Sequence, residues 1–178
     1  MRVTEAHGAT LVSLNATRTA EVFKEHARSL GQKFDVADPM PFFLHNILGI
    51  DTPGGFKLRV PLSVGTDGSV NFAAEIPEGA VVRLMSTTAD ATASAAAEAT
   101  RDAISQLGGH QPNVAIFFDC VATRLRMGKE FGYELDALRD VLGPTQFAGC
   151  NTYGQVARTD GQFSGFHNCT AVVCVLPA

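Results

Sequence analysis

The most informative segment of the sequence is Val114-Ala115-Ile116-Phe117-Phe118-Asp119-Cys120, in which five apolar residues lead directly into an acid and a thiol. Five apolar residues in a row are too few for a helix and predict a central strand buried on both faces. Two later apolar segments, 147–155 and 167–176, also border small and polar residues. Because strands hold polar groups rigidly at their ends and loops bring those groups together, the three segments predict one pocket.

Alternation of apolar and polar residues predicts an antiparallel meander upstream of this region. Its three strands are expected at 58–64, 70–76 and 81–85, with one solvated face. Asp67-Gly68 is a strong hairpin turn signal between the first two strands. Pro61 favours an edge position for the first strand, because proline cannot donate a hydrogen bond to the ladder.

Helical periodicity predicts three helices, at 19–30, 87–107 and 129–142. Another hairpin is expected from Gln155 through an Asp160-Gly161 turn to Phe163. Together these elements predict a mixed α/β fold (α+β) with a largely antiparallel sheet and two or three packed helices, in a single domain spanning residues 1–178.

Composition excludes several classes of function. The net charge is −4 and no basic cluster is present, so nucleic acid is not an expected partner. No apolar run approaches the length of about 18 residues that spans a bilayer, and no secretory signal is visible, so we expect no membrane partner and a cytoplasmic location. The four cysteines form no C-x-x-C pair, which gives no indication of a zinc ribbon or a thioredoxin-type motif.

Three blocks of the sequence resemble the C-terminal half of the FIST domain, a sensory module of signalling proteins. Members of that family show a strand that ends in a Cys-containing tract, a Gly-rich turn that ends in Gly-Glu, and a final His-Asn-x-Thr strand. The counterparts here are Cys120–Gly128, Gly149–Gln155 and His167–Thr170. The sequence departs from the family at Gln155, where Glu is usual, and the N-terminal half of a full FIST module has no counterpart.

The resemblance and the residue types together give the candidate ligand site. Arg124 follows the central strand and could bind a carboxylate with its planar fork of donors. Glycines in the second block allow backbone amides to approach a ligand closely. The full set of expected ligand-binding residues is Cys120, Arg124, Gly149, Asn151, Thr152, Tyr153, Gly154, Gln155, His167 and Asn168.

Two other functions stay open at this point. Some FIST proteins bind haem and sense nitric oxide, which here would require His45 or His167 as the axial ligand. A Cys-dependent enzyme would combine Cys120 with His167 and Asn151, although nothing in their spacing requires them to meet.

We expect a sensor rather than an enzyme, with no metal and no cofactor. Its ligand would be a small polar metabolite, an amino acid as the resemblance implies. The signal would pass in trans to a protein such as a kinase or a cyclase, and a homodimer stays open.

Overall fold

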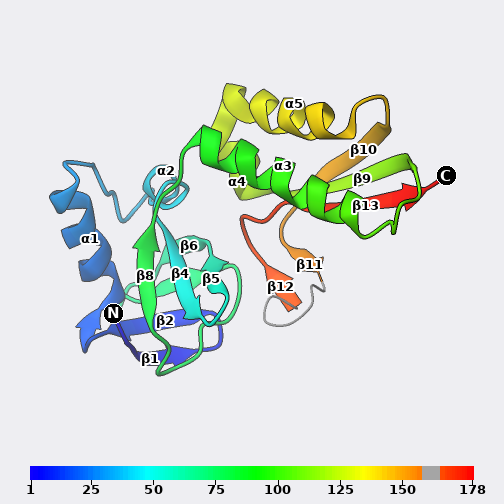
Figure 1. Ribbon diagram of the computed structural model, residues 1–178. Coiled ribbons are helices and arrows are strands. Elements are labelled where there is room, and N and C mark those ends of the chain that lie inside the picture. Colours follow the sequence, from blue (N-terminus) through cyan, green and yellow to red (C-terminus); the bar gives the residue numbers. More distant parts are fainter. Residues whose placement is uncertain (158–164) are drawn as a thin grey trace. The chain divides into compact units, whose positions relative to one another are not determined.

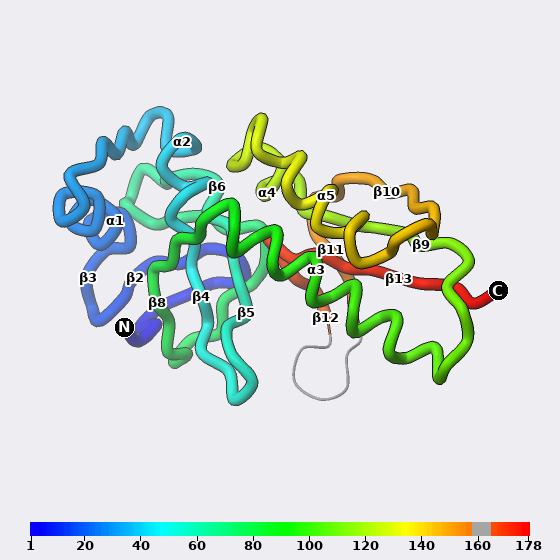
Figure 2. Tube along the Cα trace, turned by 45° about the horizontal axis from the view of Figure 1, so that its top comes forward, coloured from blue at the N-terminus to red at the C-terminus, as the bar shows by residue number. Residues whose placement is uncertain are grey.

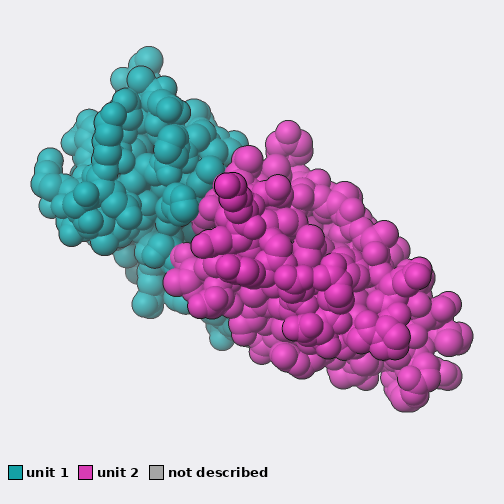
Figure 3. Space-filling view, turned by 90° about the horizontal axis from the view of Figure 1, so that it is seen from above, with its two compact units in different colours: residues 1–86, 158–168 teal, residues 87–157, 169–178 magenta. Residues whose placement is uncertain are grey.

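The computed structural model describes residues 1–157 and 165–178, which form two compact units (Figure 3). The first unit comprises residues 1–86 and the described part of 158–168, and the second comprises residues 87–157 and 169–178. The expected Asp160-Gly161 turn and Phe163 lie outside the described residues. The mixed α+β fold class is confirmed, since helices pack on sheets in which antiparallel pairs predominate (Figure 1).

The first unit contains two antiparallel sheets. One has the order β1-β2-β7-β6, with β3 paired to β2, and the other has the order β5-β4-β8. The bounds of these strands, and of β12 in the same unit, are β1 Val3–His7, β2 Thr10–Leu14, β3 Thr17–Arg18, β4 Ile47–Thr52, β5 Gly55–Arg59, β6 Pro61–Val64, β7 Val70–Phe72, β8 Val82–Met85 and β12 Gly165–His167.

Two helices, α1 (Thr19–Ser29) and α2 (Met40–Phe43), complete the core of the first unit. Phe23 of α1 is fully buried, and its ring centroid lies 5.0 Å from that of Phe43 and 6.5 Å from that of Phe72. Such tilted and edge-to-face arrangements are favourable for aromatic rings. The expected helix at 19–30 is confirmed, because the Val22-Phe23-Ala27 stripe buries against this cluster.

The predicted meander is only partly correct. Strands β6 and β7 pair antiparallel as expected, with Val64 opposite Val70. The expected strand 58–64 is however two strands in different sheets, which separate at Val60, so its apolar residues do not share one face. Strand β8 pairs with β4 instead of β7, because the segment Ile47–Thr52, for which no strand was predicted, is itself a strand.

The second unit is a three-stranded sheet of order β10-β9-β13 with helices α3 and α5 packed on it (Figure 1). Strand β10 is parallel to β9, whereas β13 is antiparallel to β9 and runs along it in the trace (Figure 2). The bounds are α3 Ala89–Ser105, β9 Pro112–Cys120, α4 Val121–Met127, the short 3₁₀ helix η1 Gly128–Glu130, α5 Phe131–Leu142, β10 Gln146–Thr152, β11 Gln155–Ala157 and β13 Val172–Pro177.

Strand β9 is central, as predicted, but it is buried on one face only. Ala115 and Phe117 point to the helices and are almost fully buried, whereas Ile116 is half-buried and Phe118 is 37% exposed on the other face. The expectation of burial on both faces was therefore wrong. Both helices lie over the same side of the sheet, where they form a core with Leu138 of α5.

The last predicted strand, 167–176, is also interrupted. Strand β12 ends at His167 and β13 begins at Val172, and between them Cys169 adopts a positive φ of 49°. Because a left-handed residue breaks the pleat, residues 167–170 do not continue the strand into β13 as the sequence predicted. Both His167 and Asn168 are buried.

Candidate functional site

A pocket of about 240 Å³ lies in the second unit, between α5 and the carboxyl-terminal parts of the parallel strands β9 and β10. We call it the α5 pocket. Crevices at the carboxyl ends of parallel strands are the usual ligand sites of α/β sheets. Its apolar walls are Phe117, Phe131, Leu135 and Phe147, and its polar side chains are Asp119 and Asn151.

Asp119 is the buried acid of the α5 pocket. It is 1% exposed, and its Oδ2 accepts a hydrogen bond of 3.2 Å from Nδ2 of Asn151, its register partner on β10. Its Oδ1 is buried with no hydrogen-bond partner among the described residues. Burial raises the pKa of Asp119 to about 7, against the smaller lowering effects of the Cys120 amide, Arg126 and Asn151.

Glu134 of α5 is a second buried acid. It is 1% exposed, and its Oε2 likewise has no partner within the described part of the chain. Burial, together with the nearby Asp119, raises the pKa of Glu134 to about 8, and Arg126 acts in the opposite direction. Arg126 itself donates to Oγ1 of Thr92 over 2.8 Å, so α3, α4, α5 and β9 all contribute to this polar cluster.

Two arginines stack on aromatic walls of the α5 pocket. The guanidinium carbon of Arg124 lies 5.1 Å from the ring centroid of Phe131, and that of Arg139 lies 5.9 Å from the ring centroid of Phe147. Arg124 also donates from Nη1 to the carbonyl of Gly128 over 2.7 Å. That glycine ends α4 with a positive φ of 55° and so allows the chain to turn towards α5.

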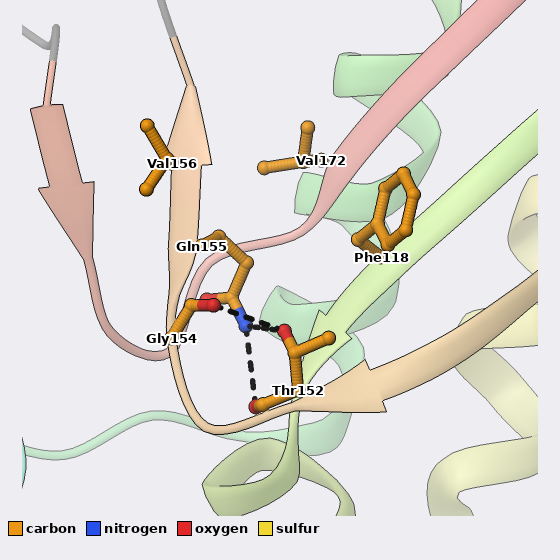
Figure 4. A pocket seen from close by; sticks show the side chains of 6 residues that line it. All are labelled: Phe118, Thr152, Gly154, Gln155, Val156 and Val172. Carbon is orange, nitrogen blue, oxygen red and sulfur yellow. Dashed lines mark hydrogen bonds between the residues drawn. The ribbon is translucent and has the colours of Figure 1, made fainter.

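A smaller pocket of about 180 Å³ also lies in the second unit, and we call it the β11 pocket (Figure 4). Gln155 lines it and is 3% exposed, with its side chain directed towards Thr152. Its Nε2 donates to Oγ1 of Thr152 over 2.8 Å and to the carbonyl of the same residue over 3.4 Å. The remaining walls are Phe118, Gly154, Val156 and Val172.

In a comparison with protein-family models, residues 19–158 match the model of the FIST C domain. The match covers more than half of the 178 residues. The chain belongs to the FIST C domain family. It is therefore a sensory domain of signal transduction. No curated protein and no solved structure matches the chain.

This FIST C domain distributes the sequence-predicted site residues over several places. Gly149 and Asn151 line the α5 pocket, with Arg124 stacked on its wall. Thr152, Gly154 and Gln155 line the β11 pocket. Within β10, Asn151 and Thr152 are neighbours and therefore point to opposite faces of the sheet, whereas Gly154 and Gln155 follow the end of that strand.

The other predicted residues lie outside both pocket linings. Cys120 is 1% exposed, whereas the side chain of Tyr153 is mostly in solvent, at 88% exposed. His167 and Asn168 belong to the first unit, where Oδ1 of Asn168 accepts a bond of 3.4 Å from the amide of Val60.

The sequence analysis missed Asp119, Glu134 and Arg126 as site residues. A signal for Glu134 was available, because it lies three residues after Phe131 and four before Leu138, inside the apolar stripe of its helix. An acid within the apolar stripe of a predicted helix means either that the helix is wrongly predicted or that the acid is buried for a functional reason. Asp119 directly follows the apolar run of β9, so its burial could also have been expected.

Neither of the two candidate haem ligands, His45 and His167, lines the α5 pocket or the β11 pocket. His45 is exposed in the turn after α2, and neither pocket is lined by a histidine. Within 1–157 and 165–178 there is no group of three or more His, Cys, Asp and Glu side chains that could hold a metal ion. None of the helices in the same ranges combines the length and apolar character that crossing a membrane requires.

Proposed function

We propose that this FIST C domain senses a small zwitterionic metabolite of the amino-acid class, which binds in the α5 pocket. The observation that carries the proposal is a buried carboxyl group, Asp119, in a pocket whose aromatic walls are overlaid by two arginines. An ammonium group would pair with Asp119, and a carboxylate would pair with Arg124 or Arg139.

The size of the α5 pocket favours a small ligand. Pockets for drug-sized molecules typically measure about 300–1,000 Å³. At about 240 Å³ the α5 pocket lies below that range, which suits a metabolite with few non-hydrogen atoms. The mostly apolar lining, which also includes Ala148 and Cys150, would bind a molecule with a short hydrocarbon part between its charged ends.

Signalling would follow from the elements that form the pocket. Ligand bridging Asp119 of β9 and Arg124 of α4 would favour one arrangement of α4 and α5 over others. The shift of α4 and α5 would alter the surface that binds a signalling protein in trans, such as a kinase or a cyclase. Alternatively, it would alter the contact between two copies of the chain in a homodimer. All four cysteines are free, which supports a cytoplasmic location.

We propose a binding protein rather than an enzyme. A nucleophilic cysteine must reach its substrate, but Cys120 is 1% exposed and lines neither pocket. Asn151, its suggested partner, is instead bonded to Asp119.

The proposal is tested by a thermal-shift screen of amino acids, repeated with analogues that lack the amino group or carry an esterified carboxylate. A ligand at a hundred times its dissociation constant stabilises the folded chain by about 2.7 kcal/mol. Asp119→Asn should weaken the binding of amino acids but not of the deaminated analogues. Arg124→Ala should weaken the binding of amino acids but not of the esters. Arg101→Ala, which removes an exposed arginine of α3, is the control.

We expect each of the two pocket variants to lower affinity about tenfold or more, because a hydrogen bond to a charged group contributes about 1.5–3 kcal/mol. An amino acid whose affinity is the same in Asp119→Asn, Arg124→Ala and the wild type would contradict the proposed site. Absence of any shift across the panel would contradict the ligand class.

A further inference from the structure

The second unit brings two cysteines together at the end of its central strand. Cys120 is the last residue of β9, and Cys169 lies three residues before the start of β13. The thiol of Cys169 hydrogen-bonds the sulfur of Cys120, whose pKa is lowered to about 6, mainly by this bond. The backbone amides of Cys169, Ala122 and Thr123 act in the same direction, and burial opposes them.

The strand register shows that this contact depends on an unusual backbone conformation. Strands β13 and β9 pair with Val172 opposite Phe118, so a continued ladder would place Thr170 opposite Cys120. Cys169 would then point to the opposite face of the sheet, since neighbouring residues of a strand alternate. The left-handed φ of 49° at Cys169 breaks the ladder and directs the thiol to Cys120.

A left-handed conformation is unfavourable for residues other than glycine, by about 1–2 kcal/mol. Residues held in such conformations occur preferentially at functional sites, where surrounding structure maintains them. The left-handed backbone of Cys169 and its thiol contact with Cys120 go together, and they indicate that the cysteine pair has a role.

We propose that Cys120 and Cys169 are a modification site that forms a reversible disulfide with a small peroxide as oxidant. This inference does not rest on the proposed ligand. Intracellular disulfides, where they occur, are usually transient and redox-sensing, which agrees with the free thiols of the structure.

The chemistry proceeds in two balanced steps. The Cys120 thiolate attacks one oxygen of the peroxide and breaks the O–O bond, which gives a sulfenic acid and, after uptake of a proton, water. The Cys169 thiol then attacks the sulfenic sulfur, and the S–O bond breaks with release of a second water as the S–S bond forms. The two thiols lose two electrons, which the peroxide gains.

The surroundings assign the two roles. Cys120 is the attacking residue because its thiolate is stabilised, and a thiolate is the nucleophilic form. Cys169 is the resolving residue, because the hydrogen bond that it donates to Cys120 and its burial both raise its pKa. Cys120 is 1% exposed, which selects a small oxidant over a bulky disulfide.

The two remaining cysteines provide a matched control. Cys150 and Cys174 are exposed on strands that flank β9 on its two sides, opposite Phe118 and Ile116 respectively. The lateral spacing of two strands alone is about 9.5 Å, and the offset of two residues along β9 adds to their separation. A disulfide requires Cα atoms within about 7 Å, so these two cannot bridge each other.

The test uses the full chain carrying Cys150→Ser and Cys174→Ser, so that only the proposed pair remains. The protein is treated with one equivalent of hydrogen peroxide, quenched, denatured and alkylated, and its intact mass is measured. We expect both thiols to disappear together, a mass lower by two hydrogens, and full recovery with dithiothreitol. In the same background, Cys169→Ser should stop at a sulfenic acid on Cys120 that dimedone traps.

Peptide mapping of the peroxide-treated wild type gives a second measurement that does not depend on the variants folding. It should show a peptide that joins Cys120 to Cys169. Further oxidation of Cys120 to sulfinic acid with Cys169 still free, or survival of both thiols, would overturn the proposal. Equal disulfide formation with oxidised glutathione would overturn the selection of a small oxidant.

Discussion

Asn151 donates a hydrogen bond of 3.2 Å to Oδ2 of Asp119, and the two residues are register partners in the parallel pair of β10 and β9. This bond satisfies one oxygen of a buried carboxyl group and leaves the other without a partner among the described residues. Glu134 has the same kind of orphan oxygen. Burial of an unpaired carboxylate is costly, so both groups favour the protonated form.

The first prediction concerns pH and stability. The pKa of Glu134 rises from 4.5 to about 8 on folding, so the folded chain binds the extra proton in that window. Folding is therefore favoured at low pH, and the free energy of unfolding should fall as pH rises from about 4.5 to about 8. Glu134→Gln should remove roughly 1–3 kcal/mol of this decline, as measured by urea unfolding across the window.

The difference between the wild-type and Glu134→Gln curves reports Glu134 together with its electrostatic coupling to Asp119, whereas the titration of Cys120 is present in both proteins. Glu130→Gln, which changes an exposed acid one turn earlier, should leave the decline in place. Parallel curves for wild type and Glu134→Gln would mean that Glu134 is already ionised in the folded chain at low pH.

The second prediction concerns Gly149, where β10 passes close to β9. A Cβ atom at this position would lie 2.0 Å from the backbone carbonyl oxygen of Phe117, its register partner. Backbone atoms in a central strand cannot move away easily, so Gly149→Ala should lower the free energy of unfolding by at least ~1–3 kcal/mol. Equilibrium unfolding in urea measures the change.

Gly132→Ala is the matched control for that substitution. Gly132 lies in α5, is exposed, and a Cβ atom there would have no atom within 4 Å. Alanine is the better helix former, so this variant should raise stability by about 0.5–1 kcal/mol. If both glycine variants changed stability in the same direction, the close approach of β9 and β10 would not be the reason for Gly149.

Sequence patterns predicted the elements whose burial is periodic. The apolar run of β9, the alanine-rich face of α3 and the stripe of α5 all bury against one another, so their patterns reflect the core directly. Helix α4 was not predicted, because it begins directly after Cys120 and lacks a capping side chain that would mark its start. The break at Val60 between β5 and β6 was not predicted, because the alternation of apolar and polar residues continues from one strand into the other.

The candidate site was harder to predict from the sequence than the secondary structure, because it depends on contacts between residues that are distant in the sequence. Gly149 and Asn151 were identified, but the pleat of β10 directs Thr152 to the opposite face, and Gln155 lies in the next strand, β11. The position of Cys169 could not be foreseen, since cysteine has no preference for the left-handed conformation that it adopts. A continuous strand was therefore the natural expectation at 167–176.

The last prediction concerns the charge of Cys120. Its pKa of about 6 means that the thiolate forms below neutral pH, and its stabilisation comes first from the Cys169 thiol. The neighbouring charged groups act in opposite senses, since the carboxyl of Asp119 disfavours a nearby thiolate and the guanidinium of Arg126 favours one. Ultraviolet thiolate absorbance, taken as wild type minus Cys120→Ser, should therefore show a step with its midpoint near pH 6.

Cys169→Ala removes the thiol donor, and the midpoint should then move towards 9.0, the ordinary value for a thiol. Removal of an exposed cysteine by Cys174→Ser should leave the step near pH 6 in place. A wild-type titration with no thiolate below neutral pH would show that burial outweighs the donors around Cys120. Cys120 would then react with peroxide slowly, because little of the nucleophilic form would be present.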